Sequence, residues 1–113
     1  MTPKTLRFSQ LSLARQRLVR ICQTLNFGQI QGVTVRDGDP IFEPAPVVVS
    51  DTKLYRDDGP RLELQLADFD LRDDVRRLMA QLDEGRNGFI ERIEVQAGMP
   101  RRVRFRTTVR GPA

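Results

Sequence analysis

The residues best suited to chemistry are one set of oxygen-bearing side chains and one row of arginines. Asp83, Asn87 and Glu94 take positions one, five and twelve of a twelve-residue calcium-binding spacing, with a glycine at position six. Position three is Gly85, which offers no side-chain oxygen, although calcium takes about six to eight oxygen ligands. The segment is therefore a weak calcium candidate, and a plain loop between a helix and a strand is the favoured alternative.

Enzyme chemistry finds little support in the residue types. The chain has no histidine and one cysteine, Cys22, so it lacks zinc-type ligand spacing and the base of a Ser-His-Asp or Cys-His nucleophile. The carboxylate pairs 57/58 and 73/74 are adjacent in sequence, a pattern typical of turns and helix starts. No phosphate-binding glycine motif is present. We expect no enzymatic activity, no cofactor and no metal.

The arginine row lies near the C-terminal end of the chain. Arg102, Arg104 and Arg106 alternate with Val103 and Phe105, so a strand here would have one apolar and one basic face. Such a face can follow a phosphate backbone, although it can also be simply solvated, and aromatic residues for base stacking are scarce. The candidate polyanion-binding residues are Arg15, Arg20, Arg101, Arg102, Arg104 and Arg106.

Charge is unevenly placed along the chain, although the net charge is only +4. Residues 1–36 carry six cations and no acid, residues 57–94 carry eleven acids and six arginines, and residues 95–113 carry five arginines and no acid. This asymmetry is typical of a polyanion-binding surface, but the basic ends can equally pair with the acidic middle inside the fold.

The chain is similar to itself at an offset of 60 residues. The pattern G-x-I-x-x-[VI]-x-V-x-x-G-x-P occurs at 28–40 and again at 88–100. The apolar stripes that precede it match at an offset of 57, which puts a three-residue difference in the loop at 83–87. We predict a duplicated unit within a single domain over 1–113, with repeat one at about 9–43 and repeat two at about 68–109.

Each copy has the pattern of a helix followed by a β-hairpin. Apolar residues at intervals of three and four predict helices near 10–25 and 70–84, and Cys22 lies on the first apolar stripe as a core residue. The candidate N-caps are Ser9 or Ser12 for the first helix and Asp68 or Asp70 for the second. Alternating apolar residues and a turn at 37–38 predict the first hairpin.

A linker joins the two units over 44–67. Prolines at 44 and 46 interrupt regular structure, and Val47–Leu54 has the composition of a strand. A turn at 57–60 and alternating leucines at 62, 64 and 66 would add an extra hairpin to the sheet or cover its edge. The predicted fold class is α+β: two α-β-β units form a mainly antiparallel sheet of four to six strands with two helices on one face.

The stretch from Leu25 to Ile41, LNFGQIQGVTVRDGDPI, resembles small bacterial helix–hairpin proteins of the YezD-like kind, whose pattern runs F-G-x-[IV]-x-[IV]-x-[IV]-x-D-G-x-[VP]. The resemblance covers about 30 residues. This chain departs from the pattern at 31–32, where one extra residue separates Ile30 from Val33 and suggests a bulge. The resemblance implies a helix–hairpin fold, and it brings no catalytic or binding residue because the function of those proteins is uncharacterised.

Two functional classes remain open after these considerations. We expect a non-enzymatic protein-interaction or adaptor module whose protein partner is unknown, and the alternative is a nucleic-acid-binding protein that uses the arginine-rich strand face. An exposed apolar patch would favour the first class, and a continuous arginine stripe the second. No apolar run is long enough to span a membrane and no signal peptide is evident, so we expect a cytoplasmic location. Homo-oligomerisation is left open.

Overall fold

The computed structural model describes residues 7–55 and 62–106. Within these residues the chain forms two short 3-10 turns (η), two α-helices and five strands, which confirms the predicted α+β class. In chain order the elements are η1 (Phe8–Gln10), α1 (Leu13–Leu25), β1 (Gly28–Arg36), β2 (Asp39–Ile41), β3 (Val47–Ser50), η2 (Leu62–Gln65), α2 (Asp73–Gly85), β4 (Gly88–Gln96) and β5 (Met99–Arg106).

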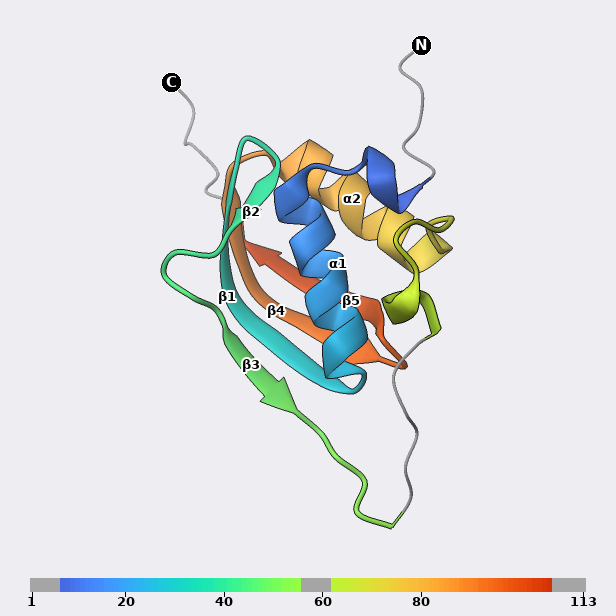
Figure 1. Cartoon of the computed structure of the whole chain (residues 1–113). Helices are drawn as coiled ribbons and strands as arrows, with labels where there is room; N and C mark the ends of the chain where they lie inside the picture. Colours follow the sequence, from blue (N-terminus) through green and yellow to red (C-terminus); the bar gives the residue numbers. More distant parts are fainter. Residues whose placement is uncertain (1–6, 56–61, 107–113) are drawn as a thin grey trace, which may run out of the picture.

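The strands form one antiparallel sheet in the order β2-β1-β4-β5, and β3 pairs with β1 on the same side as β2. Strands β1 and β4 lie at the centre and pair over almost their whole length, from Gly28 opposite Val95 to Val35 opposite Gly88. One edge of the sheet is therefore β5, and the other is formed by β2 and β3 in succession (Figure 1).

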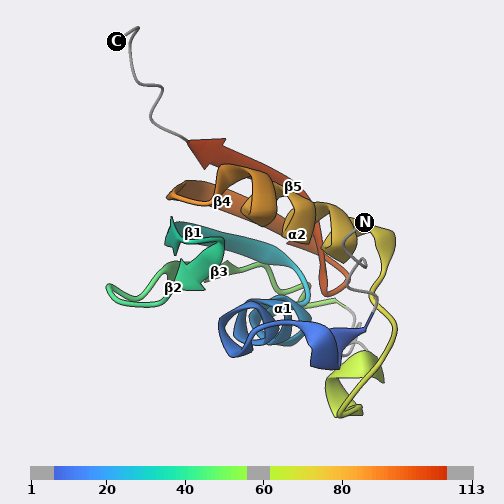
Figure 2. The ribbon, with the colours of Figure 1, turned by 90° about the horizontal axis from the view of Figure 1, so that it is seen from above.

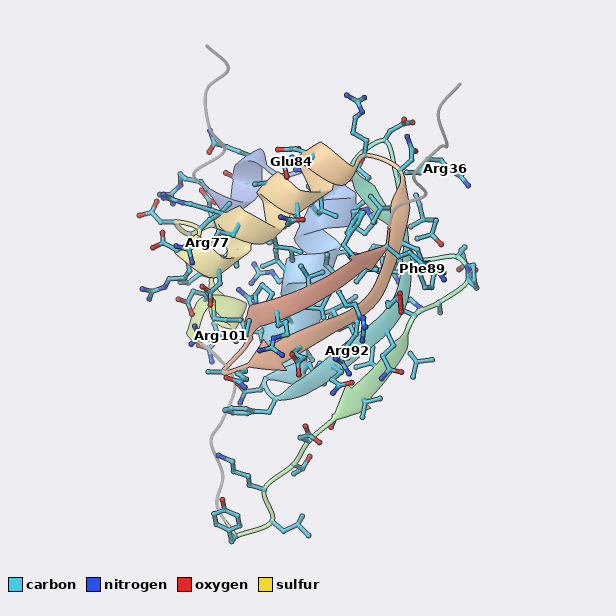
Figure 3. All side chains as sticks on the ribbon, turned by 180° about the vertical axis from the view of Figure 1, so that it is seen from behind. Arg36, Arg77, Glu84, Phe89, Arg92 and Arg101 are labelled. Carbon is cyan, nitrogen blue, oxygen red and sulfur yellow. The ribbon has the colours of Figure 1, made fainter. Side chains whose placement is uncertain are left out.

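Both helices cover the same face of the sheet, and no element of the described residues covers the opposite, open face (Figures 1 and 3). The view from above shows the strands edge-on with α1 beneath them (Figure 2). The inward residues of β1 and β4 meet the apolar stripes of both helices in one core. Its fully buried members include Leu18, Ile30, Leu82, Ile90 and Ile93, each contributing about 1.5–3 kcal/mol on burial. The predicted core position of Cys22 is confirmed, since its exposed fraction is 1%.

The two halves correspond at an offset of 60 throughout, which makes the expected offset of 57 for the helices wrong. Helices α1 and α2 have 13 residues each, and β1 and β4 have nine. Buried helix residues pair as Leu18 with Leu78 and Val19 with Met79. The error has a physical reason: residues three apart lie on the same helix face, so a shift of three leaves an apolar stripe almost unchanged. No length difference falls in the loop at 83–87. Duplication as the origin of this correspondence stays a prediction.

The helix starts differ from each other. Helix α1 begins after Ser12, whose side chain accepts a hydrogen bond from the Arg15 N–H at 3.2 Å, as one of the predicted caps. Helix α2 begins after Arg72, whose side chain makes no capping bond, so the caps expected from Asp68 or Asp70 are wrong. Those two carboxylates bind the Arg7 side chain instead, each at 2.8 Å.

Each hairpin turn is hydrogen-bonded to the end of the helix in the other half. The Gly38 N–H in the turn between β1 and β2 donates to the Arg86 carbonyl at 2.7 Å, just after α2. The Gly98 N–H in the turn between β4 and β5 donates to the Asn26 carbonyl at 2.8 Å, just after α1. Both glycines have positive φ, +81° and +75°, a conformation that glycine adopts at little cost.

The extra hairpin expected over 47–66 does not form. Part of its first strand is present as β3, but this strand pairs with β1. The alternating leucines from 62 onward form the 3-10 turn η2 and no strand. Arg20 explains the difference, because its guanidinium donates to the carbonyls of Glu63 and Leu66 and so holds this segment against α1. The turn predicted at 57–60 lies outside the described residues.

Candidate nucleic-acid interface

Three of the predicted arginines, Arg15, Arg20 and Arg101, lie on the helix side of the molecule and have partners within the fold. Arg15, with 14% of its side chain exposed, donates to the Gly38 carbonyl at 3.0 Å and to Asp83 at 2.7 Å. Arg101 donates to Asp74 of α2 at 2.6 Å. The basic N-terminal part of the chain therefore pairs in part with the acidic middle, which was one of the two outcomes that the charge distribution allowed.

Arg20 is likewise a structural residue. Its guanidinium carbon lies 4.3 Å from the centre of the Phe8 ring and 5.3 Å from that of Phe69, and the two rings stack on each other at 4.8 Å. The same group donates to Gln23 at 2.9 Å. The structure therefore places three of the predicted residues, Arg15, Arg20 and Arg101, in interactions on the helix side. It does not bring them together with the arginines of the open face.

The open face of the sheet holds the other predicted arginines, and the strand register arranges them in three rows. Across β1, β4 and β5 the first row is Gln29, Glu94 and Arg102; the second is Gln31, Arg92 and Arg104; the third is Thr34, Phe89 and Arg106. Arg36 ends β1 on the same face, beyond the third row. Phe89, Arg92 and Arg36 can be followed along this face in Figure 3. Five arginines therefore share one uncovered surface, which we call the arginine face: Arg36, Arg92, Arg102, Arg104 and Arg106.

The arginine face also carries two acids, Glu91 and Glu94; Glu91 is exposed beside Arg92, because both lie between the buried Ile90 and Ile93. Glu94 lies 3.4 Å from the Arg102 guanidinium, and both side chains are solvent-accessible. Arg106 stacks over the Phe89 ring at 4.9 Å from its centre. Arg92 and Arg104 lie directly opposite each other on neighbouring strands, and neither forms an ion pair within the described residues. Like charges in directly opposite positions destabilise a sheet, so an anion that bridges these two guanidiniums would relieve repulsion.

The middle row is set by a bulge. The β4–β5 register shifts between Ile90 and Arg92, so Glu91 is left without a partner on β5 and Arg92 comes opposite Arg104. In β1, Gly32 has φ of +80° and lies opposite Glu91, since the β1–β4 register runs without a shift from Gln31 opposite Arg92 to Val33 opposite Ile90. The register shift therefore belongs to the β4–β5 pair, and the bulge suggested at 31–32 of β1 stays a prediction.

The three residues of the weak calcium candidate, Asp83, Asn87 and Glu94, do not form a common site. Asp83 accepts from Arg15, the Asn87 side-chain oxygen accepts from the Asp37 N–H at 3.1 Å, and Glu94 lies within strand β4. The segment is the helix-to-strand loop that was the favoured alternative. Residues 7–55 and 62–106 contain no cluster of three or more His, Cys, Asp or Glu side chains that could hold a metal ion.

Three titratable groups among the described residues have clearly shifted pKa values, and none lies on the arginine face. The hydrogen bond with Asp68 raises the pKa of Arg7; the other two shifted groups are Cys22 and Asp68. Burial raises the pKa of the Cys22 thiol to about 12. The hydrogen bond from the Arg7 side chain, together with one from the Ser9 N–H, lowers the pKa of Asp68 to about 2. Cys22 and Asp68 therefore serve the fold, the first as an apolar core residue and the second as the anchor of the η1 segment.

Sequence reasoning missed Arg36, Arg92 and Phe89 as parts of this surface. They lie on β1 and β4, and nothing in a single strand places them beside β5. They could have been found by pairing the two similar strands, 28–36 and 88–96, antiparallel to each other. This register puts Phe89 opposite Thr34 and Arg92 opposite Gln31.

Comparisons with protein-family models, curated proteins and solved structures found no match. The resemblance of residues 25–41 to YezD-like proteins therefore stays a prediction. No helix in the described part of the chain is long and apolar enough to cross a membrane.

Proposed function

We propose that this chain is a binding module that holds single-stranded nucleic acid across its arginine face. The observation that carries the proposal is the opposed pair Arg92 and Arg104, two cations on neighbouring strands that form no ion pair within the described residues. A bound phosphate supplies the missing negative charge and can accept hydrogen bonds from both guanidiniums.

The spacing of the arginines supports a linear polyanion. Arg102, Arg104 and Arg106 lie two residues apart along β5, so their side chains emerge about 6.8 Å apart on one face. Arg92 and Arg36 extend the charge across the neighbouring strands. A chain of phosphates crossing the sheet therefore meets several cations in succession, whereas a single small anion would use only one pair.

Phe89 supports nucleic acid over other polyanions. It is the one aromatic residue among the three rows of the open face, and its ring is partly exposed beside Arg106. An aromatic ring next to cations is the usual platform on which an unpaired base stacks. One such platform provides affinity without reading a sequence, so we expect binding to single strands that depends little on base composition.

The test is fluorescence anisotropy with labelled random-sequence single- and double-stranded DNA and RNA, using inorganic polyphosphate as competitor. The decisive variant is Arg102→Gln/Arg104→Gln/Arg106→Gln, which removes three charges and keeps side chains of similar length. A matched control, Arg72→Gln/Arg76→Gln/Arg77→Gln, removes three exposed charges, one from the residue before α2, which pairs with Glu63 at 3.4 Å, and two from α2 itself. Arg77 in Figure 3 shows where that control lies.

We expect the wild type and the α2 variant to bind single strands similarly and the β5 variant to lose most of its binding. Equal losses in both variants would reduce the interaction to net charge alone. Polyphosphate that binds as tightly as single strands would exclude a role for base stacking. Absence of binding by the wild type at low salt would refute the proposal.

The earlier expectation of a protein-interaction module stays a prediction, and it rests on a different surface. The free edge of strand β3 is apolar and lies at the opposite side of the sheet from β5.

A further inference from the structure

The two edges of the sheet carry opposite chemistry. Edge strand β5 carries arginines at 101, 102, 104 and 106, and charged side chains are the usual protection of a strand edge against pairing with another chain. Edge strand β3 reads Val47-Val-Val-Ser50, and no charged residue occurs from Pro44 to Ser50. The exposed fractions of the three valines are 59%, 47% and 41%. One edge is therefore protected and the other is open.

The outward side of β3 offers free backbone groups. The Asp51 N–H donates to the Phe27 carbonyl at 2.8 Å, so the alternate residues 47, 49 and 51 direct their backbone groups toward β1. The N–H and C=O groups of Val48 and Ser50 consequently point away from the sheet. Within the described residues no strand pairs with this side of β3.

A groove lies beneath the same edge, between β3 and α1. It encloses about 430 Å³, and its apolar wall is formed by Ile21, Leu25 and Val48, with Arg17 among its other lining residues. The side chain of Val48 lies on this helix side of the sheet, since it pairs with the fully buried Ile30. A further strand added next to β3 would direct alternate side chains into this groove, and valine matches its apolar wall.

The segment after β3 also exposes large apolar side chains. Leu54 and Tyr55 have exposed fractions of 95% and 82%, and Figure 1 shows this segment running away from the body of the molecule. Large apolar side chains are stabilised when a partner covers them and removes them from water.

We propose that a second copy of this chain occupies the β3 edge, with the two β3 strands antiparallel and Val48 of one copy opposite Val48 of the other. In this register the two Val48 residues exchange N–H and C=O hydrogen bonds. Each Ser50 N–H donates to the Pro46 carbonyl of the other copy, where the missing proline N–H defines the end of the ladder. Each copy directs Val48 toward the groove of the other.

The occupant is a second copy because this edge is complementary to itself. An uncharged, valine-rich strand pairs best with another uncharged strand, and pairing about a twofold axis uses the same surface on both chains. The assembly stops at two copies because each outer edge of the joined sheet is then an arginine-bearing β5. The proposal is independent of nucleic-acid binding, since it uses the opposite edge of the sheet.

The test measures the mass of the full chain in solution by light scattering during gel filtration, over a dilution series. The wild type is expected at twice the chain mass of 13.0 kDa, with dissociation on dilution. Val48→Pro removes the outward N–H and leaves the bonds of residues 47 and 49 to β1 intact, so it should be monomeric. The matched control Val48→Thr keeps both the N–H and the branched shape and should remain dimeric.

Amide hydrogen exchange of the wild type supplies a readout that needs no variant. Exchange at Val48 and Ser50 should slow as protein concentration rises, while Val49, which is bonded to β1, should be protected at every concentration. A wild type that is monomeric throughout, or a dimer in which Val48 and Ser50 exchange at the same rate at all concentrations, would overturn the proposal. So would a folded Val48→Pro variant that remains dimeric.

Discussion

Replacing Arg104 with glutamate should separate the stability of the fold from its binding activity. In the wild type Arg104 lies directly opposite Arg92, and neither forms an ion pair within the described residues. Arg104→Glu converts this like-charge pair into an opposite-charge pair. Directly opposed pairs contribute about 0.2–1 kcal/mol in a sheet, so the variant should be as stable as the wild type or up to about 1 kcal/mol more stable. For a domain of this size that corresponds to a rise in Tm of up to about 4 °C.

The same change should weaken nucleic-acid binding and its dependence on salt. If all five arginines of the arginine face contact phosphates, the slope of log K against log salt is about −3.5 for a single strand, and affinity falls about 100-fold between 50 and 200 mM salt. Arg104→Glu removes one phosphate contact, and a second is lost because Arg92 then pairs with the new carboxylate. Three contacts remain, so the slope is about −2.1 and the affinity falls about 20-fold over the same range of salt.

Two assays decide the outcome: thermal unfolding followed by circular dichroism, and anisotropy titrations at several salt concentrations. Arg76→Glu on α2 is the control, because it makes the same charge change away from the open face. The reasoning is refuted if Arg104→Glu and Arg76→Glu have the same salt slope. A variant that is clearly less stable than the wild type would show that Arg92 and Arg104 do not repel each other in the folded protein.

Further predictions concern single residues. Phe89→Ala should lower single-strand affinity by about 1–3 kcal/mol without changing the salt slope, measured by the same titrations, because it removes one stacking platform and no charge; an altered slope would contradict this role. Cys22 should not react with a thiol reagent at pH 8 until the protein is unfolded, because burial raises its pKa to about 12; rapid labelling of native protein would contradict the buried position. Asp68→Asn should flatten the loss of stability on acidification, measured by denaturant unfolding at several pH values. Since the folded pKa of Asp68, about 2, lies below the ordinary value of 3.8, its bond to Arg7 contributes fully above pH 4 and is lost as the pH falls toward 2; an unchanged profile would show that the bond contributes nothing.

Much of the fold could be predicted because its signals are local. The apolar stripes of the helices, the Ser12 cap and the turn at 37–38 depend on residues close together in sequence. The second N-cap could not be predicted in this way. Asp68 has the right residue type for a cap, but Arg7, more than 60 residues away, binds its carboxylate. The 3-10 turn η2 could not be predicted for the same reason. The alternating pattern predicts a strand, but the Arg20 guanidinium donates to a carbonyl of this segment, which a strand would pair within a sheet.

The site was predicted only in part for a related reason. Arg102, Arg104 and Arg106 were recognised because alternation along one strand is visible in the sequence. Arg92 joins them only through a pairing across β4 and β5 that includes a bulge. Arg15 and Arg20 were grouped with them by charge alone, and charge in a sequence does not indicate which side of a sheet a residue occupies.

The exchanged hydrogen bonds of the hairpin turns determine how the chain must fold. The turn at Gly38 completes the end of α2, which lies 48 residues later, and the turn at Gly98 completes the end of α1, which lies 72 residues earlier. In each half, the carbonyl that follows the helix accepts its hydrogen bond from a glycine N–H of the other half. Neither half can therefore reach its final structure before the other has formed. Contacts between residues so distant in sequence slow folding, because a long loop must close before they form. The repeated appearance of the chain therefore does not make its halves autonomous, and unfolding should proceed as one cooperative transition.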